Sequence, residues 1–118
     1  MSAPDALHDL RDRLRRFAAE RDWQQFHSPK NLAIALSVEA AELLEHFQWL
    51  PEEASWQLPA EDLARVREEL ADVLLYLVRL ADELGVDLAA AGRDKIELNA
   101  RRYPADKARG TSRKYTEL

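Results

Sequence analysis

The stretch SVEAAELLEHFQW, residues 37–49, has the pattern of a helix throughout, yet it carries a glutamate where an apolar residue is expected. One face of this segment and of the residues before it is apolar when the chain is drawn as a helix. The residues of that stripe are Leu32, Ala35, Leu36, Leu43 and Phe47. Glu39 falls inside the stripe, where a lone ionised carboxylate is costly. It must therefore be neutralised, paired or bound to a metal.

A second helical stretch, LADVLLYLV at residues 70–78, has Asp72 as its only charged residue. Leu75 and Val78 lie outside the face that the other leucines of this helix define. A helix that is apolar nearly all round is buried nearly all round, which a single chain of this size does not easily achieve. The pattern predicts that this helix lies in a homo-oligomeric interface. The alternative is crowding within one chain.

Prolines and one glycine divide the chain into four expected helices, and no segment shows the alternation of a strand. We therefore expect an all-α fold, with a four-helix-bundle type of protomer that assembles into a helical homo-oligomer. The expected helices run from Ser2 and Pro4 to about Asp22, from Ser28 and Pro29 to about Leu50, from Pro59 to Gly85, and from Asp87 to about Arg102.

The length of 118 residues, 13.6 kDa, is that of one domain. We expect the domain to span residues 1–103, followed by a basic and mobile C-terminal tail at residues 104–118. The formal net charge is −5, but residues 101–118 contain six Lys or Arg against two Asp or Glu, so residues 1–100 carry −9. An acidic body argues against nucleic acid as the partner.

The chain contains no cysteine, which excludes disulfides and thiolate metal sites and leaves oxygen ligands or the three histidines. The N-terminal sequence, MSAPDALHDLRDRLRRF, has no uninterrupted apolar segment, and no apolar run is long enough to span a bilayer. We therefore expect a soluble, cytoplasmic protein without a membrane partner.

Two of the expected helices each carry an acidic pair with a spacing of three residues, Glu39 with Glu42 and Glu69 with Asp72. Residues three apart share a helix face, so the carboxylates suit convergence on a hard divalent cation, Mg²⁺ or Mn²⁺. The alternatives are solvated faces or buried ion pairs, although the apolar stripes of these helices supply no Lys or Arg. A diiron site would need Glu-x-x-His, whereas His46 follows Glu42 by four positions.

A polar and basic row on the last expected helix consists of Lys95, Asn99 and Arg102. Mg²⁺ in proteins commonly sits on a few carboxylates plus substrate phosphates, and such a row suits phosphate. The alternative is a solvated helix face. The three glycines form neither a Walker loop nor a dinucleotide-binding motif, so any phosphate would be held by metal and side chains.

Four segments together resemble a known family. They are ERDWQQFHSPKNLAIALSVEAAELLEHFQW at residues 20–49, REELADVLLYLVRLADELGVDL at residues 67–88, KIELNARRYP at residues 95–104 and SRKYTEL at residues 112–118. The chain resembles the all-α nucleoside triphosphate pyrophosphohydrolases of the MazG-like superfamily, and within it the dCTP pyrophosphatase branch. The resemblance implies Mg²⁺-dependent cleavage of dCTP or a related pyrimidine deoxynucleoside triphosphate between its α and β phosphates, as nucleotide-pool house-cleaning. It also implies a homodimer or a homotetramer.

The resemblance implies that the metal-binding and catalytic carboxylates are Glu39, Glu42, Glu69 and Asp72. The substrate-binding residues that it implies are Trp23, Gln24, Gln25, Phe26, His27, Trp49, Tyr76, Lys95, Asn99, Arg102 and Lys114. Plain core packing is the alternative for the tryptophans. Leu14 stands where animal members of this branch carry a histidine. Two rival functions are a structural helical oligomer and a regulator that binds nucleotide without turnover.

Overall fold

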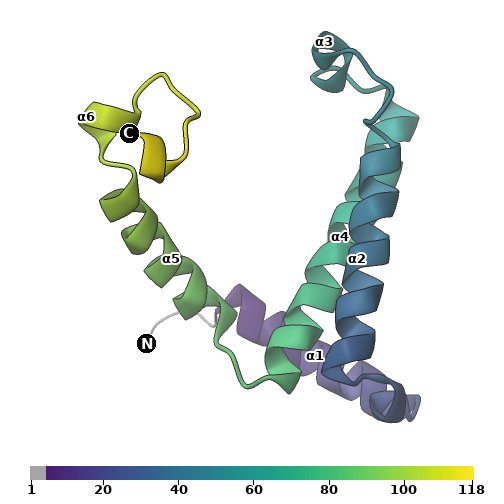
Figure 1. The fold of residues 1–118 in the computed structure, drawn as a ribbon. Coiled ribbons are helices and arrows are strands. Elements are labelled where there is room, and N and C mark those ends of the chain that lie inside the picture. Colours follow the sequence, from purple (N-terminus) through teal and green to yellow (C-terminus); the bar gives the residue numbers. More distant parts are fainter. Residues whose placement is uncertain (1–4) are drawn as a thin grey trace. The chain divides into compact units, whose positions relative to one another are not determined.

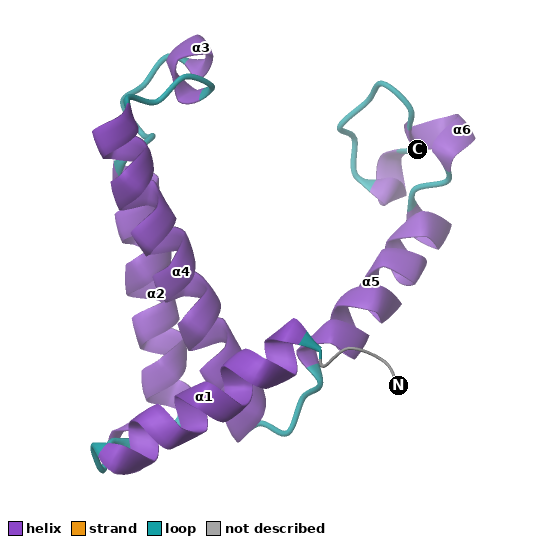
Figure 2. Ribbon diagram, turned by 180° about the vertical axis from the view of Figure 1, so that it is seen from behind, coloured by secondary structure: helices purple, strands orange, loops and turns teal. Residues whose placement is uncertain are grey.

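The computed structural model describes residues 5–118, and throughout that range the chain forms helices and loops without a strand (Figure 1, Figure 2). The all-α class predicted from the sequence is therefore confirmed. None of the described helices is both long enough and apolar enough to cross a membrane. The chain divides into two compact units, the first ending at Val86 and the second running from Asp87 to Leu118.

The first unit is built around one long helix, α4 (Ala60–Glu83), against which α1 (Ala6–Glu20) and α2 (Pro29–Glu45) both pack. Helix α2 runs beside α4, while α1 crosses the C-terminal part of α4 (Figure 1, Figure 2). Two short elements complete this unit, η1 (Gln24–Phe26) between α1 and α2, and α3 (Glu52–Ser55) between α2 and α4 in the chain.

Capping residues set the ends of these helices. The Ser28 hydroxyl accepts a hydrogen bond from the Asn31 backbone N–H at 3.1 Å, and Pro29 is the first residue of α2, as the sequence predicts. Gly85 adopts a φ of +67° directly after α4, also as predicted. Helix α1 is capped by Asp5. Ser2 and Pro4, which were expected to open this helix, lie outside the described residues.

The loops differ from the sequence-based expectation in two ways. Helix α2 ends at Glu45 instead of near Leu50, and residues 46–49 form a turn before Pro51. Short helices also occupy the connectors: η1 lies in the expected loop at residues 23–28, and α3 follows Pro51. The two glutamates in the first turn of α3 complement the helix dipole.

The apolar core of the first unit lies where α1 and α2 meet α4. Its most buried apolar residues are Ala18, Leu32, Val66, Val78 and Ala81. The expectation of an oligomer interface is wrong for Val78 and stays a prediction for Leu75. Val78 is only 4% exposed within the single chain, and Leu75 lines a pocket together with residues of α1. Crowding within the chain, the alternative explanation, accounts for Val78.

A different face of α4 is left uncovered by the first unit. Leu63 is 56% exposed and Leu70 is 54% exposed, and Leu74 follows on the same side of the helix. On α2, Ile34 and Val38 are likewise exposed. These apolar side chains one turn or more apart form stripes of the kind that pack against another helix.

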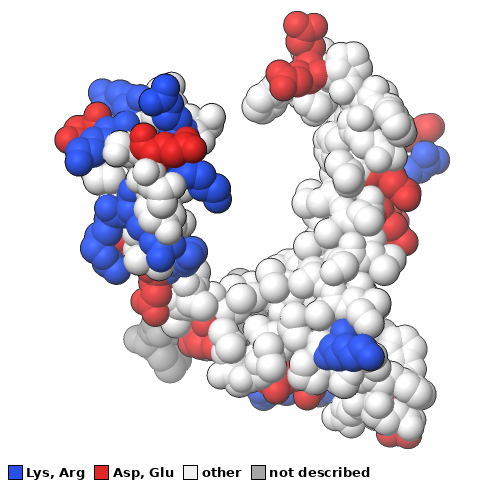
Figure 3. Space-filling view, in the orientation of Figure 1, with Lys and Arg blue, Asp and Glu red and all other residues white. Residues whose placement is uncertain are grey.

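The second unit consists of α5 (Leu88–Arg102), α6 (Ala105–Ala108) and η2 (Tyr115–Glu117). Its last segment folds back: the rings of Tyr103 and Tyr115 meet edge to face at 5.8 Å, and the Arg102 guanidinium lies 4.9 Å from the Tyr115 ring. Figure 3 shows Lys and Arg side chains gathered on this unit. The domain boundary expected at residue 103 falls between α5 and α6, and the mobility of the tail stays a prediction.

Candidate metal centre and pocket

Three carboxylates from two helices meet in the first unit. Glu39 comes from α2, and Glu69 and Asp72 come from successive turns of α4. One carboxylate oxygen from each lies within 4.8 Å of the others. Glu39 and Glu69 are half-buried, whereas Asp72 is exposed. The contact between α2 and α4 therefore brings together residues that the sequence predicted to converge.

Glu42, one turn after Glu39, lies outside that set of three, but its side chain contributes to the raised pKa values of Glu39 and Glu69. Burial, the neighbouring Glu42 carboxyl group and the other surrounding negative charges raise the pKa of Glu39 from an ordinary value of 4.5 to about 7. Burial and repulsion by Glu42 also raise the pKa of Glu69. Crowded in this way, Glu39 and Glu69 resist ionisation in the absence of a cation.

The donor set fits a hard divalent cation. The Oε2 atoms of Glu39 and Glu69 are buried, and neither has a hydrogen-bond partner within residues 5–118. Buried polar atoms normally have partners, so this pair points to a ligand that binds oxygen. The His46 Nε2 atom lies 3.9 Å from Glu69 Oε1, at the edge of the cluster. Carboxylate oxygens grouped this closely are suitable ligands for Mg²⁺ or Mn²⁺.

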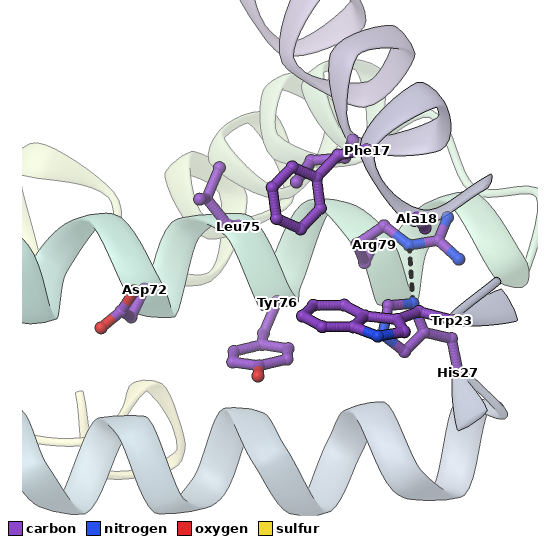
Figure 4. A pocket seen from close by; sticks show the side chains of 9 residues that line it. Phe17, Ala18, Trp23, His27, Asp72, Leu75, Tyr76 and Arg79 are labelled. Atoms are coloured by element: carbon purple, nitrogen blue, oxygen red, sulfur yellow. Dashed lines mark hydrogen bonds between the residues drawn. The ribbon is translucent and has the colours of Figure 1, made fainter. Parts of the chain in front are cut away.

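Asp72 of the cluster also lines a pocket of about 150 Å³, which Figure 4 shows. Its apolar lining comes from Leu14, Phe17 and Ala18 of α1 and from Leu75 of α4. Leu14 therefore makes the pocket wall apolar at this point.

Aromatic rings form much of the remaining pocket wall. The Trp23 ring meets the Phe17 ring edge to face at 5.6 Å, and it meets the His27 ring at 6.4 Å. Tyr76 of α4 lines the same pocket (Figure 4). Three of the predicted substrate-binding residues, Trp23, His27 and Tyr76, are thus brought together. Flat apolar faces beside an acidic cluster can hold a planar ring next to a charged group.

Arg79 also lines the pocket, although it was not among the residues predicted from the sequence. It is only 4% exposed, and its Nε donates a hydrogen bond to His27 Nδ1 at 3.4 Å. The signal available in the sequence was its isolation, since Arg79 is the only basic residue between Arg67 and Arg93. Burial lowers the pKa of His27, and the nearby charge of Arg79 lowers it further.

The other predicted substrate-binding residues do not line this pocket within the described chain. Gln24, Gln25 and Phe26 form η1 and are exposed, and Trp49 is 85% exposed in the turn after α2. The predicted residues of the second unit are Lys95, Asn99, Arg102 and Lys114, all of them exposed. In that unit, Arg102 stacks on Tyr115.

Known proteins of one family are similar to this chain. Residues 34–118 match the MazG-like family. The chain is 50% identical to dCTP pyrophosphatase 1 of Homo sapiens and 46% identical to dCTP pyrophosphatase 1 of Bos taurus, in alignments that cover 99% of this chain and 70% of each relative. A crystal structure of a pyrophosphatase from Archaeoglobus fulgidus is 40% identical, with a TM-score of 0.76, covering 88% of this chain and 97% of that one.

Proposed function

The chain belongs to the MazG-like family and is a nucleoside triphosphate pyrophosphohydrolase, and we propose that its substrate is dCTP or a related pyrimidine deoxynucleoside triphosphate. The proposed cleavage lies between the α and β phosphates and yields the monophosphate and pyrophosphate. The observation that carries this proposal is an acidic cluster joined through Asp72 to an aromatic pocket. Two relatives that align with almost the whole chain are dCTP pyrophosphatases, which supports the choice of base.

The proposed metal site consists of Glu39, Glu42, Glu69 and Asp72, with Mg²⁺ as the ion and Mn²⁺ as a substitute. Mg²⁺ bound there would offset the charge of the phosphates and acidify water for attack at phosphorus. With Mg²⁺ bound, the carboxylates would hold the triphosphate next to the pocket, because Asp72 is part of both. A cation bound there would offset the negative charges and the burial that raise the pKa of Glu39 in the metal-free site.

The pocket is the proposed site of the base. Trp23 and Tyr76 offer ring faces and His27 offers a polar edge. Its volume of about 150 Å³ is well below the roughly 300–1,000 Å³ of pockets that enclose a whole ligand. It is therefore suited to one flat ring, while the phosphates would lie at the carboxylates.

The remaining predicted contacts stay proposals. By family resemblance, we propose that Gln24, Gln25, Phe26 and Trp49 contact the nucleotide and that Lys95, Asn99, Arg102 and Lys114 contact its phosphates. We also propose a homodimer or homotetramer in which a second copy covers the exposed stripes of α2 and α4 and completes a helical bundle. A cytoplasmic location remains a prediction from the sequence.

Pyrophosphate release by the full chain tests the proposed function. With Mg²⁺, dCTP should give dCMP and pyrophosphate in equal amounts, and with chelator it should give neither. An Asp72→Asn variant serves as the inactive control. Release of orthophosphate would contradict cleavage between the α and β phosphates. Metal-dependent binding of dCTP without turnover would favour a regulator, and neither binding nor turnover would favour a structural oligomer.

A further inference from the structure

Among residues 5–118, Arg79 is the only charged residue that is buried, and it lies in the pocket wall. Its guanidinium donates hydrogen bonds to Glu83 Oε1 at 2.5 Å and to Asp82 Oδ2 at 3.3 Å. Asp82 in turn accepts hydrogen bonds from Arg15 of α1. Asp82 and Glu83 thus balance the positive charge of Arg79. A substrate phosphate is therefore not required to pair with its guanidinium.

The third contact of Arg79 is with His27, and it determines which ring nitrogen carries the proton. The Arg79 Nε–H points to His27 Nδ1 at 3.4 Å (Figure 4). Because arginine has donors only, Nδ1 must be the unprotonated acceptor, and the neutral imidazole then carries its hydrogen on Nε2. Burial and the Arg79 charge lower the pKa of His27, with Glu83 opposing them, so the ring stays neutral at neutral pH.

A histidine held in this way presents a hydrogen-bond donor and no free acceptor. Cytosine offers two adjacent acceptors, N3 and O2, on its pairing edge, whereas N3 of uracil and of thymine carries a hydrogen. An Nε2–H group therefore matches cytosine N3 and opposes the N3–H of the other two bases. The other tautomer would present an acceptor at Nε2 and reverse this match.

We propose that Arg79 is a positioning residue that holds His27 as the Nε2–H tautomer, so that the imidazole donates a hydrogen bond to the base and selects cytosine over uracil and thymine. The inference rests on the proposed function, because it takes the pocket to hold the base of a pyrimidine nucleotide. It adds a residue that sets the base preference through another side chain. Arg79 acts through one hydrogen bond, to His27 Nδ1.

The first test is long-range ¹H–¹⁵N NMR of the histidine rings in the wild-type full chain without substrate. His27 should show a protonated Nε2 and an unprotonated Nδ1, and a His27→Gln variant assigns its signals against the other two histidines. This measurement does not depend on turnover. A predominant Nδ1–H tautomer in the wild type overturns the proposal even if the protein is an active pyrophosphohydrolase.

The second test compares Arg79→Lys with Arg15→Lys. Lysine can pair with Asp82 and Glu83 but lacks the fork that also reaches His27, so the tautomers should mix and the dCTP to dTTP ratio of kcat/KM should fall roughly fivefold or more. Arg15→Lys disturbs the same ion pairs without a contact to His27, and it should keep both the tautomer and the ratio.

The outcomes separate the two proposals. An unchanged ratio in a folded Arg79→Lys variant with mixed tautomers shows that His27 does not read the base, which overturns the inference. Equal losses in both variants show that the ion-pair network matters only for folding, which also overturns it. Absence of turnover with every triphosphate refutes the proposed function instead.

If Arg79→Lys does not fold, a comparison of His27→Asn with His27→Gln replaces it. Only the glutamine side chain reaches the Nε2 position with a donor, so only His27→Gln should retain the preference for dCTP.

Discussion

Carboxylate oxygens of Glu39 on α2 and Glu69 on α4 meet within 4.8 Å, and each residue buries an Oε2 atom that has no hydrogen-bond partner in the part of the chain that the structure describes. Selection for stability alone would favour an apolar or paired residue at these positions. The arrangement makes the metal-free site a source of instability. Stability and activity should therefore respond in opposite directions when one of these carboxylates is neutralised.

Replacing Glu39 with glutamine tests this opposition. The variant should lose turnover by at least about 100-fold, because a proposed metal ligand is removed. In chelator it should be as stable as the wild type or more stable, because a buried charge and its repulsion are gone. Saturating Mg²⁺ should stabilise the wild type by about 2.7 kcal/mol at 100 times Kd and the variant much less. Thermal and urea unfolding measure these effects.

The matched control is Glu45→Gln, at an exposed position at the end of the same helix. It should change neither turnover nor the response to Mg²⁺. A large loss of stability in Glu39→Gln with chelator present would mean that the Glu39 carboxylate is a structural partner, and the metal-site proposal would then fail.

The pH dependence of metal-free stability is a second prediction. Because the native pKa of Glu39 is about 7 and its ordinary value is 4.5, the native state keeps a proton that the unfolded chain releases between these values. The stability of the wild type should therefore fall, relative to Glu39→Gln, as pH rises from about 4.5 to 7. Urea unfolding of both proteins in chelator across this range measures the difference. Parallel curves would show that the Glu39 pKa is not raised.

The meeting of Glu39 and Glu69 could be predicted because it depends on local periodicity: each residue interrupts or borders an apolar stripe, and apolar stripes pack together. The role of Arg79 could not, because its burial depends on α1 crossing α4, a contact between segments far apart in sequence. Leu75 and Val78 show the same limit. An apolar side chain suits a pocket, a core or an interface equally well until the neighbouring helix is placed.

Three tryptophans provide a matched test of the base pocket. Trp23 lines the pocket, whereas Trp49 and Trp56 are 85% and 87% exposed in the single chain. Trp23→Ala should lower kcat/KM for dCTP. The loss should correspond to about 1–3 kcal/mol of transition-state stabilisation, which is the magnitude of one lost ring-stacking contact. Trp49→Ala should do the same if it reaches the nucleotide as proposed, and Trp56→Ala should not. Equal kinetics for Trp49→Ala and Trp56→Ala would remove Trp49 from the substrate-binding set.

Assembly should depend on the exposed stripe of α4. Leu70 is 54% exposed, so Leu70→Glu leaves the core of the single chain intact while placing a charge in the proposed interface. Sedimentation velocity at micromolar concentration should show the wild type as a dimer or larger and Leu70→Glu as a smaller species. The control is Ala64→Glu, which puts the same charge at an exposed position on another side of α4. A monomeric wild type would refute the oligomer proposal.

The profile of kcat/KM over nucleoside triphosphates is the broadest prediction from the pocket. A pocket of about 150 Å³ walled by Phe17, Trp23 and Tyr76 suits one ring. The kcat/KM for dCTP should therefore exceed those for dATP and dGTP by at least about tenfold, because overfilling a packed site commonly costs about 1–3 kcal/mol.

CTP should have a lower kcat/KM than dCTP, since a site closed around the 2′ carbon leaves the added hydroxyl clashing or unpaired. Leu14 makes one wall apolar, so a 5-methyl group on cytosine should be tolerated or favoured. Steady-state assays over dCTP, 5-methyl-dCTP, dATP, dGTP and CTP measure the profile. Equal rates for purines and pyrimidines would refute the proposed base pocket, because the size of the pocket would then not select the base. The proposed metal site would be unaffected by that result.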